Sequence, residues 1–161
     1  MKRLYIYVAT SWRNEFQPEV VRLLREDGHD VYDFRGEEGF SWTEVNEDWQ
    51  NWTPKQYIAG LNHTCANRGF KRDMDALLRA DATVYVMPCG PSASMELGWA
   101  AGMQQLTIVY IPKLREPDLM VKMADLITDD LNEVRERLIE WAAVPTVFER
   151  ARLIRGQRTA W

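Results

Sequence analysis

The stretch ATVYVMPCGPSASMELGWAAG, residues 82–102, decides the fold class of this chain. Its opening residues, 82–87, form an apolar run typical of a strand buried in a parallel sheet. A short turn of Pro, Cys, Gly and Ser follows, and residues 94–103 predict a helix. Open α/β sheets bind ligands at the carboxyl ends of their strands, and free backbone N–H groups at a helix start favour anions. Glu96 therefore lies just inside a helix that begins where such a sheet holds its ligand.

The rest of the chain repeats this alternation of strands and helices. Nearly all-apolar strands that alternate with helices favour a doubly wound, flavodoxin- or Rossmann-like parallel sheet. We expect an α/β fold with four to five strands flanked by helices, in a single domain over residues 1–161. The remaining strands are expected at 4–9, 30–34 and 106–111, and the remaining helices before Gly28 and at 70–80, 117–126, 130–142 and 147–154.

Residues 36–67 break this pattern. The segment has weak periodicity and is rich in Trp, Asn, Glu and Gly, with a short helix expected near 54–61. Because loops this long in a compact domain are usually functional or disordered, we interpret it as a Trp-rich lid insertion over the ligand site. Its residues Trp42, Trp49 and Trp52 either stack on a flat base, as aromatic side chains do with nucleobases, or pack the lid against the domain.

The composition argues against several classes of protein. The 161 residues include 20 Lys and Arg against 24 Asp and Glu, and this net charge of −4 argues against a broad basic surface for DNA or RNA. The sequence has no basic and apolar leader, no long apolar span and only two cysteines. We therefore expect a reduced, soluble, cytoplasmic protein with no membrane partner. His63 and Cys65 are too isolated for a metal site, and we expect no cofactor.

Two carboxylates are the candidates for chemistry. A carboxylate such as that of Glu96 can attack an anomeric carbon or stabilise an oxocarbenium-like transition state. The same residue also suits a helix start through the helix dipole alone. A departing base needs a proton or a strong hydrogen bond, which Asp73 in the preceding helix could supply. The alternative is that Asp73 and Asp75 are solvated acids near a helix N-terminus, and of the two we expect Asp73 to act.

Small polar residues are expected at the same edge of the sheet. Ser11 and Arg13 follow the first strand, so in a parallel sheet they reach the edge that holds the later helix start. Arg13 could bind a phosphate through its guanidinium group, or could be an exposed side chain. Ser92 and Ser94 could donate to the same phosphate or cap the helix. Cys89 lies beside this turn with no His nearby in the sequence, and we assign it no chemistry.

The chain carries RDMDALLRAD at 72–81, then an apolar strand, and MELGWA at 95–100. Together with the first strand and its loop, these segments resemble the nucleoside 2-deoxyribosyltransferase family and the related deoxynucleoside 5′-monophosphate N-glycosidases, over roughly the first 125 residues. The resemblance implies that Glu96 is the nucleophile, that Asp73 handles the departing base and that Tyr7 orients the nucleophile. The implied activity is cleavage or transfer of the N-glycosidic bond of a (deoxy)nucleoside or nucleotide.

The segment Ser11-Trp12-Arg13 resembles the Ser-x-Arg of the monophosphate hydrolases, and Ser92 resembles their phosphate-contacting serine. This likeness implies recognition of a 5′-phosphate. The chain departs from these relatives in the loop before Glu96, which is about two residues shorter and lacks the Asp of the transferases. It also has Val121 where the hydrolases place a serine from a neighbouring subunit, with Lys122 as the candidate substitute. Sites in this family are completed across a dimer, so the resemblance implies a homodimer or higher homo-oligomer.

The expected ligand is a small-molecule nucleoside or nucleotide, with Glu96, Asp73 and Tyr7 as catalytic residues. A TIR-like NAD glycohydrolase is an alternative, because it also uses a Glu on a flavodoxin-like sheet. A non-catalytic nucleotide-binding sensor module is a second alternative, in which the Trp residues clamp a ligand. The joint presence of the three catalytic candidates favours an enzyme. The candidate substrate-binding residues are Ser11, Trp12, Arg13, Phe34, Trp42, Gly90, Ser92 and Ser94.

Overall fold

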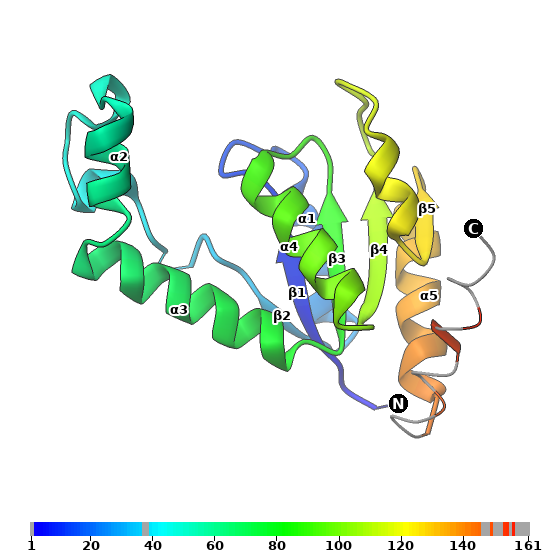
Figure 1. Ribbon diagram of the computed structural model, residues 1–161. Helices are drawn as coiled ribbons and strands as arrows, with labels where there is room; N and C mark the ends of the chain where they lie inside the picture. Colours follow the sequence, from blue (N-terminus) through cyan, green and yellow to red (C-terminus); the bar gives the residue numbers. More distant parts are fainter. Residues whose placement is uncertain (1, 37–38, 146–148, 150–152, 155, 157–161) are drawn as a thin grey trace.

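The computed structural model describes residues 2–36, 39–145, 149, 153–154 and 156. Within them lies a five-stranded parallel sheet of order β2-β1-β3-β4-β5 with helices on both faces (Figure 1), which confirms the predicted α/β fold. None of these helices has the length and apolar character of a bilayer-spanning segment. The strands are β1 (Tyr5–Ala9), β2 (Asp30–Tyr32), β3 (Ala82–Val86), β4 (Leu106–Tyr110) and β5 (Leu126–Thr128). The α-helices are α1 (Gln17–Glu26), α2 (Pro54–Gly60), α3 (Thr64–Arg79), α4 (Pro91–Gly102) and α5 (Leu131–Ala143).

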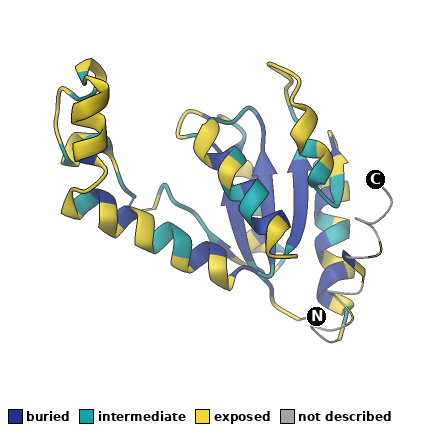
Figure 2. Cartoon of the chain, in the orientation of Figure 1, coloured by how far each residue is buried: buried dark blue, intermediate teal, exposed yellow. Residues whose placement is uncertain are grey.

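The alternation of side chains along the strands divides the core into two layers. Successive side chains of β1 point to opposite faces of the sheet. Ile6 and Val8 therefore pack with α1 and α5, whereas Tyr7 and Ala9 pack with α3 and α4. The central strand β3 is buried at every position (Figure 2), as expected for a parallel strand that is covered on both faces.

The loops after β1 and β3 are fastened to each other. The strand order reverses between these neighbouring strands, and this is the position at which open α/β sheets bind ligands. The buried side-chain amide of Asn14 donates to the carbonyl oxygens of Val86 at 2.9 Å and Pro88 at 3.1 Å. Its Oδ1 accepts a hydrogen bond from the backbone N–H of Phe16 at 2.8 Å. One side chain thus fixes both loops at the expected ligand position.

Helix α3 is longer than the sequence pattern indicates. The pattern predicts a helix at 70–80, whereas α3 begins at Thr64 and ends at Arg79. Its start is set by His63, whose Nδ1 accepts a hydrogen bond from the backbone N–H of Cys65 at 3.3 Å. A capping histidine carries no periodic apolar signal, so the early start was not visible in the sequence.

The buried face of α3 consists mainly of small residues. The spacing of Phe70, Met74, Leu77 and Leu78 in the sequence predicts that they share an apolar face, but Phe70 and Leu78 are exposed, Met74 is half-buried and Leu77 alone is buried. A Cβ atom at position 69 would lie 2.7 Å from the Cβ of Phe40, so Gly69 allows the segment before α2 to approach the helix closely. The predicted apolar face was therefore wrong in part, because close backbone approach replaced large side chains.

Residues 40–63, which we call the Trp lobe, are carried on the N-terminal half of α3 and lie away from α4 (Figure 1). The lobe contains α2, as expected, and two short 3-10 helices at Trp42–Glu44 and Trp49–Asn51. A Cβ atom at position 60 would lie 2.7 Å from the ring of Trp52, so Gly60 lets this ring lie directly on α2. The lobe is thus a small packed unit rather than an extended loop.

The segment after β4 also differs from the prediction. The sequence predicts a helix at 117–126, but the chain forms a 3-10 helix, η3 (Leu119–Met123), and then enters β5. Asp125 fixes the start of β5 beside β4, because its Oδ2 accepts hydrogen bonds from the backbone N–H and the hydroxyl of Thr107 at 2.8 and 2.9 Å. The helix expected at 147–154 lies largely outside the described residues.

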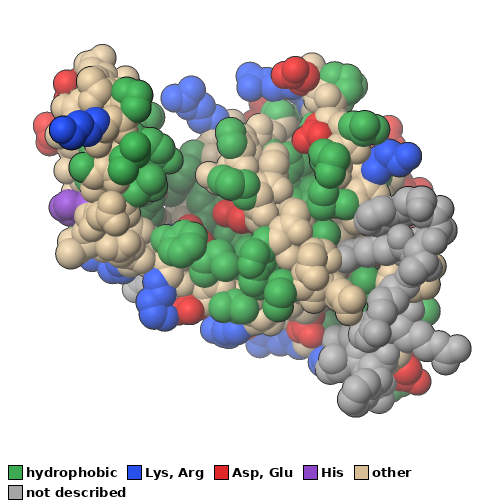
Figure 3. Space-filling model, viewed as in Figure 1, with side chains coloured by type: hydrophobic (Ala, Val, Ile, Leu, Met, Phe, Trp, Pro, Cys, Tyr) green, Lys and Arg blue, Asp and Glu red, His purple; other side chains and the backbone are tan. Residues whose placement is uncertain are grey.

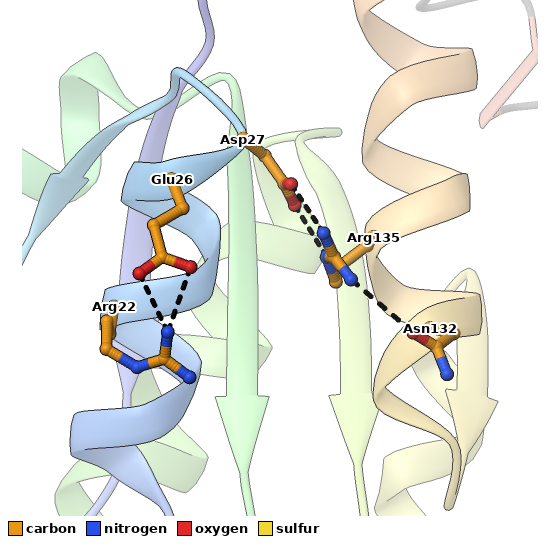
Figure 4. Close-up of polar contacts among 5 residues, drawn as sticks. All are labelled: Arg22, Glu26, Asp27, Asn132 and Arg135. Carbon is orange, nitrogen blue, oxygen red and sulfur yellow. Dashed lines mark hydrogen bonds and ion pairs between the residues drawn. The ribbon is translucent and has the colours of Figure 1, made fainter.

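Helices α1 and α5 cover one face of the sheet and are joined by an ion pair (Figure 4). The guanidinium of Arg135 donates to both carboxylate oxygens of Asp27, each at 2.7 Å. These hydrogen bonds hold the pKa of the Asp27 carboxyl group below its usual value. Arg22 and Glu26 form an exposed pair one helical turn apart on α1, at 2.7 Å.

Candidate active site

Glu96 lies one turn inside α4, with its side chain partly buried. The hydroxyl of Tyr7 faces the Glu96 carboxylate, and hydrogen bonding from it favours the ionised form of Glu96. Burial raises the pKa of Glu96 to about 7, the bond from Tyr7 acts in the opposite direction, and the negative charge of Asp73 adds to the increase. Near neutral pH this carboxyl group is therefore divided between its protonated and ionised forms.

Tyr7 is a fixed hydrogen-bond donor. It is almost fully buried in β1, and its pKa is raised first by burial and then by the charges of Glu96 and Asp73. The phenol therefore stays protonated at any pH at which the protein functions. Its hydroxyl can stabilise the ionised form of Glu96 without itself losing a proton.

Asp73 lies in the middle of α3, so the prediction that it sits near the helix start was wrong. Its Oδ1 accepts a hydrogen bond from the hydroxyl of Tyr32, at the end of β2, at 2.5 Å. The guanidinium of Arg72 lies 3.2 Å from the same oxygen, and its Nε donates to the Tyr32 hydroxyl at 2.9 Å. Among the described residues no hydrogen bond engages Oδ2 of Asp73. The carboxylate is held from one side and keeps one oxygen for a ligand.

Two stacked tyrosines connect these carboxylates. Tyr7 and Tyr32 occupy paired positions in β1 and β2, with ring centroids 5.2 Å apart and ring planes inclined by 21°. The Tyr32 hydroxyl donates to Asp73, and the Tyr7 hydroxyl faces Glu96. Asp73 is also close enough for its charge to raise the pKa of Glu96. The structure therefore brings together the carboxylates that the sequence predicted, above the sheet face covered by α3 and α4.

The surface is hollowed between the Trp lobe and α4 (Figure 3). Acidic side-chain atoms lie at the base of this hollow, and apolar side chains surround them (Figure 3). The setting combines an apolar surround with a few polar groups, as small-molecule sites usually do.

The N-terminus of α4 carries no side-chain cap. Gly90 is the N-cap residue, and neither serine of the first turns makes a capping hydrogen bond, so the capping alternative is wrong. The Ser94 hydroxyl lies 3.0 Å from the Tyr85 hydroxyl and 3.5 Å from the Gly90 carbonyl oxygen. Ser92 is exposed. The free backbone N–H groups and the Ser92 hydroxyl are thus the groups that an anion could contact here.

The loop after β1 has a backbone held by hydrogen bonds, and its exposed side chains include Trp12 and Arg13. Arg35, from the loop after β2, donates to the carbonyl oxygens of Ser11 and Asn14, the latter at 2.9 Å. Trp12 and Arg13 are exposed. The Arg13 side chain is therefore exposed to solvent on a loop whose backbone is fixed by hydrogen bonds from Arg35.

The candidate aromatic residues fall into two groups. Trp12 and Phe34 meet edge to face, with ring centroids 5.2 Å apart, and a Cβ atom at position 39 would lie 2.9 Å from the Trp12 ring. Trp42 lies instead inside the Trp lobe. Its edge-to-face partners are Phe40, Trp52 and Tyr57, with ring centroids 5.0, 5.7 and 5.7 Å away. The structure therefore does not place Trp42 with the aromatic pair at the sheet edge.

The thiol of Cys89 is half-buried just before the start of α4. The Cys89 thiol donates to the carbonyl oxygen of Val86 at 2.8 Å, and burial raises its pKa to about 11. A protonated thiol is a weak nucleophile. In the part of the chain that the structure describes, no group of three or more His, Cys, Asp or Glu side chains is placed to hold a metal ion.

The sequence interpretation missed Tyr32, Arg72, Asn14 and Arg35. Tyr32 had a usable signal, because it lies on a predicted strand and alternates with the apolar Val31. Arg72 had none, because adjacent residues on a helix normally point in different directions. Asn14 and Arg35 act through backbone carbonyl groups of distant loops, and such contacts leave no pattern in the sequence.

Neither a family model nor a curated protein matches the sequence. Solved structures do. A 2-deoxyribosyltransferase from the psychrotolerant bacterium Bacillus psychrosaccharolyticus has a TM-score of 0.55 and 20% sequence identity, covering 80% of this chain and 88% of that chain. A CMP N-glycosidase of Clostridium botulinum, BcmB, has a TM-score of 0.46 and 18% identity, covering 83% and 96%. The fold of this chain is thus similar to that of the 2-deoxyribosyltransferase over most of its length.

Proposed function

We propose that this protein cleaves or transfers the N-glycosidic bond of a (deoxy)nucleoside or nucleotide, with Glu96 as the nucleophile and Asp73 assisting departure of the base. One observation carries the proposal: carboxylates from two helices face a stacked pair of tyrosines, with Asp73 hydrogen-bonded to Tyr32 and Glu96 facing Tyr7. The fold, shared with the 2-deoxyribosyltransferase at 20% identity, is consistent with it.

In the first step an oxygen of ionised Glu96 attacks C1′ of the sugar. The C1′–O bond forms as the C1′–N bond breaks, and the bonding electron pair leaves with the base nitrogen. Tyr7 positions Glu96 and stabilises its ionised form through its hydrogen bond. Because the pKa of Glu96 is about 7, the fraction ready to attack rises with pH through neutrality.

Asp73 acts on the departing base. Its Oδ1 is fixed by Tyr32 and Arg72, so Oδ2 is the oxygen that hydrogen-bonds to the base or delivers a proton to it. In the second step water attacks C1′ and displaces Glu96, which gives the free sugar, and the proton lost by water restores Asp73 if Asp73 protonated the base, or neutralises the base if it left as an anion. A second base that attacks in place of water gives a new nucleoside.

We also propose that the remaining candidate residues bind the rest of the substrate. In this proposal a 5′-phosphate lies between Arg13 and the start of α4 at Gly90 and Ser92, with Ser11 and Ser94 nearby. The pair formed by exposed Trp12 and half-buried Phe34 borders the sugar or base, and Trp42 reaches it only if the Trp lobe moves. Exposed apolar side chains on α3, α4 and η3 support assembly into a homo-oligomer: Phe70, Leu78, Met95, Leu119 and Met120.

The test is release of free base from a panel of nucleosides, nucleoside 5′-monophosphates and NAD. We expect release from at least one nucleoside or monophosphate, and a loss of more than about 10³-fold in Glu96→Gln. Glu136→Gln, an exposed carboxylate on α5, is the matched control and retains full activity. Thermal melting checks that both variants fold.

Each other outcome is informative. Release from NAD alone would replace this proposal with a NAD glycohydrolase. Ligand-induced thermal stabilisation without base release from any compound would indicate a sensor module. Activity retained in Glu96→Gln would remove Glu96 from the mechanism.

A further inference from the structure

Apart from the hollow between the Trp lobe and α4, a cavity of about 400 Å³ lies between α3 and the edge of the sheet at β1 and β2. We call it the α3 groove. Tyr5 and Tyr32 line it from the sheet side. Its size is in the range of small-molecule sites, about 300–1,000 Å³. Nothing in the proposed reaction uses this space.

The α3 groove concentrates positive charge. Arg68, Arg72 and Arg79 line it from one face of α3, because residues four and seven apart along a helix share a face, and Lys71 lies beside them. Asp75 is the acidic residue of the lining. The whole chain carries a net charge of −4, so this local excess of cations is not a consequence of composition. Lys and Arg side chains are visible along the edge beneath α3 (Figure 3).

The cations differ in how far their charge is already neutralised. Lys71 pairs with Asp75 at 2.5 Å, and Arg68 pairs with Glu44 at 3.0 Å, both at exposed positions. Exposed pairs of this kind are weak and exchange readily with other anions. Arg79 has no carboxylate partner among the described residues. Its guanidinium instead lies over the ring of Tyr5, 4.4 Å from the centroid.

The stacking contact orients Arg79. A guanidinium that covers a ring with its flat face keeps its N–H groups, which lie in its own plane, directed outward around the edge. Burial raises the pKa of Tyr5, so its phenol stays neutral beneath Arg79. The groove therefore offers the guanidinium group of Arg79, oriented by its contact with Tyr5. It also offers Arg68 and Lys71, whose ion pairs with carboxylates are exposed to solvent.

We propose that the α3 groove binds a small phosphorylated molecule, distinct from the substrate that reacts at Glu96. Several guanidinium and ammonium groups around one cavity suit a group with multiple negative charges, and guanidinium groups match phosphate oxygens in a bidentate manner. A nucleic acid is not favoured, because the net charge of the chain is negative and the cations are confined to one groove. Arg72 and Tyr32 border both this groove and Asp73, so the two sites are neighbours.

The test is isothermal titration of the protein with inorganic pyrophosphate at constant ionic strength. The groove variant is Arg68→Ala/Arg79→Ala, which leaves Arg72 and Tyr32 in place. The matched control is Arg13→Ala, which removes a cation from the proposed substrate-phosphate site. We expect at least about tenfold weaker binding in the groove variant and unchanged groove binding in the control. Thermal melting of each variant checks its fold.

The remaining outcomes overturn the proposal. These are no binding to the wild-type protein, equal binding by the groove variant, loss in Arg13→Ala alone, or equal weakening in both variants, which indicates a diffuse charge effect. Tighter binding of citrate than of pyrophosphate at the groove would indicate a carboxylate ligand and would also contradict it. The measurement involves no turnover, so it succeeds or fails independently of the proposed glycosidic activity.

Discussion

The two faces of the sheet contain very different chemistry, although the same strands build both. The face under α1 and α5 is apolar at Ile6 and Val8, and its ion pair between Asp27 and Arg135 lies outside the apolar layer. The opposite face carries Tyr7 from the same strand, together with the carboxylates of α3 and α4. Because successive side chains of a strand alternate, one strand can supply structural core to one layer and a functional group to the other.

Compared with the apolar face, the polar face carries a desolvation cost for its partly buried carboxyl groups. A partly buried carboxyl group such as Glu96 is desolvated, and its pKa of about 7 reflects that cost. Hydrogen bonds from Tyr7 to Glu96, and from Tyr32 to Asp73, offset part of it. The polar face is therefore the one where substitutions should change chemistry, and the apolar face is the one where they should change stability alone.

Asp73→Asn should produce the largest change on the polar face after loss of Glu96. We expect a fall of about 10²-fold or more in base release, the size usual for loss of a general acid or base. Removing the negative charge of Asp73 also lowers the pKa of Glu96, so the residual activity should rise at lower pH than in the wild type. Asp75→Asn, an exposed and paired acid on the same helix, is the control. Equal activity in the two variants would contradict the role of Asp73.

Tyr7→Phe should separate positioning from chemistry. A hydrogen bond to a charged group is worth about 1.5–3 kcal/mol, so we expect roughly tenfold or greater loss of activity at neutral pH. The bond lowers the pKa of Glu96, so its removal should move the rise of activity with pH upward from about 7. The pH profile is the decisive measurement. Tyr5→Phe, two residues earlier on the same face, should leave the profile unchanged.

Asn14→Ala should weaken the attachment between the loops after β1 and β3, at the edge of the sheet where the two faces meet the candidate site. The substitution removes the amide group that donates to the carbonyl oxygens of Val86 and Pro88 and the oxygen that accepts from the Phe16 N–H, and we expect a loss of about 1–3 kcal/mol in the free energy of unfolding. Urea denaturation measures this value. The exposed Asn67→Ala is the control, and an equal loss in both variants would mean that Asn14 does not fasten the loops.

Arg135→Ala should have the smallest effect, because its pair with Asp27 is partly exposed. We expect only a small loss in the free energy of unfolding, because exposed ion pairs are weak, and no change in base release. The pKa of Asp27 is lowered in the folded state, so this contribution is present above the pKa of the unfolded carboxyl and disappears as pH falls through the folded value. Denaturation at pH 7 and pH 3 checks both points. Arg22→Ala, whose pair is more exposed, is the control.

Much of the fold could be predicted because it depends on local patterns. The apolar runs of β1, β3 and β4 and the turn before Glu96 are visible in the sequence, and the sheet has them where expected. The strand β5 was missed, since its three residues are too few for a periodic signal. Its position depends on Asp125, which binds Thr107 across the sheet. That contact joins residues far apart in the chain.

In the candidate site, too, local patterns could be predicted from the sequence, whereas long-range contacts could not. Glu96 and Asp73 were identified as residues, but the position of Asp73 in its helix was predicted wrongly, because the helix start depends on His63. Phe70 and Leu78 suggested an apolar face, whereas close approach of Phe40 to Gly69 decides how α3 packs. Such contacts depend on backbone distances that no periodicity encodes.

The sequence by itself determined which chemical groups the protein has and the order of its strands and helices, because apolar periodicity and helix signals act over a few residues. Only the tertiary structure decided that Tyr7 and Tyr32 stack, that they hold Glu96 and Asp73, and that the cations of α3 surround one groove. The pairing of β1 with β2 and the packing of α3 and α4 on one face set these distances, and both are long-range contacts between segments that are separate in the chain.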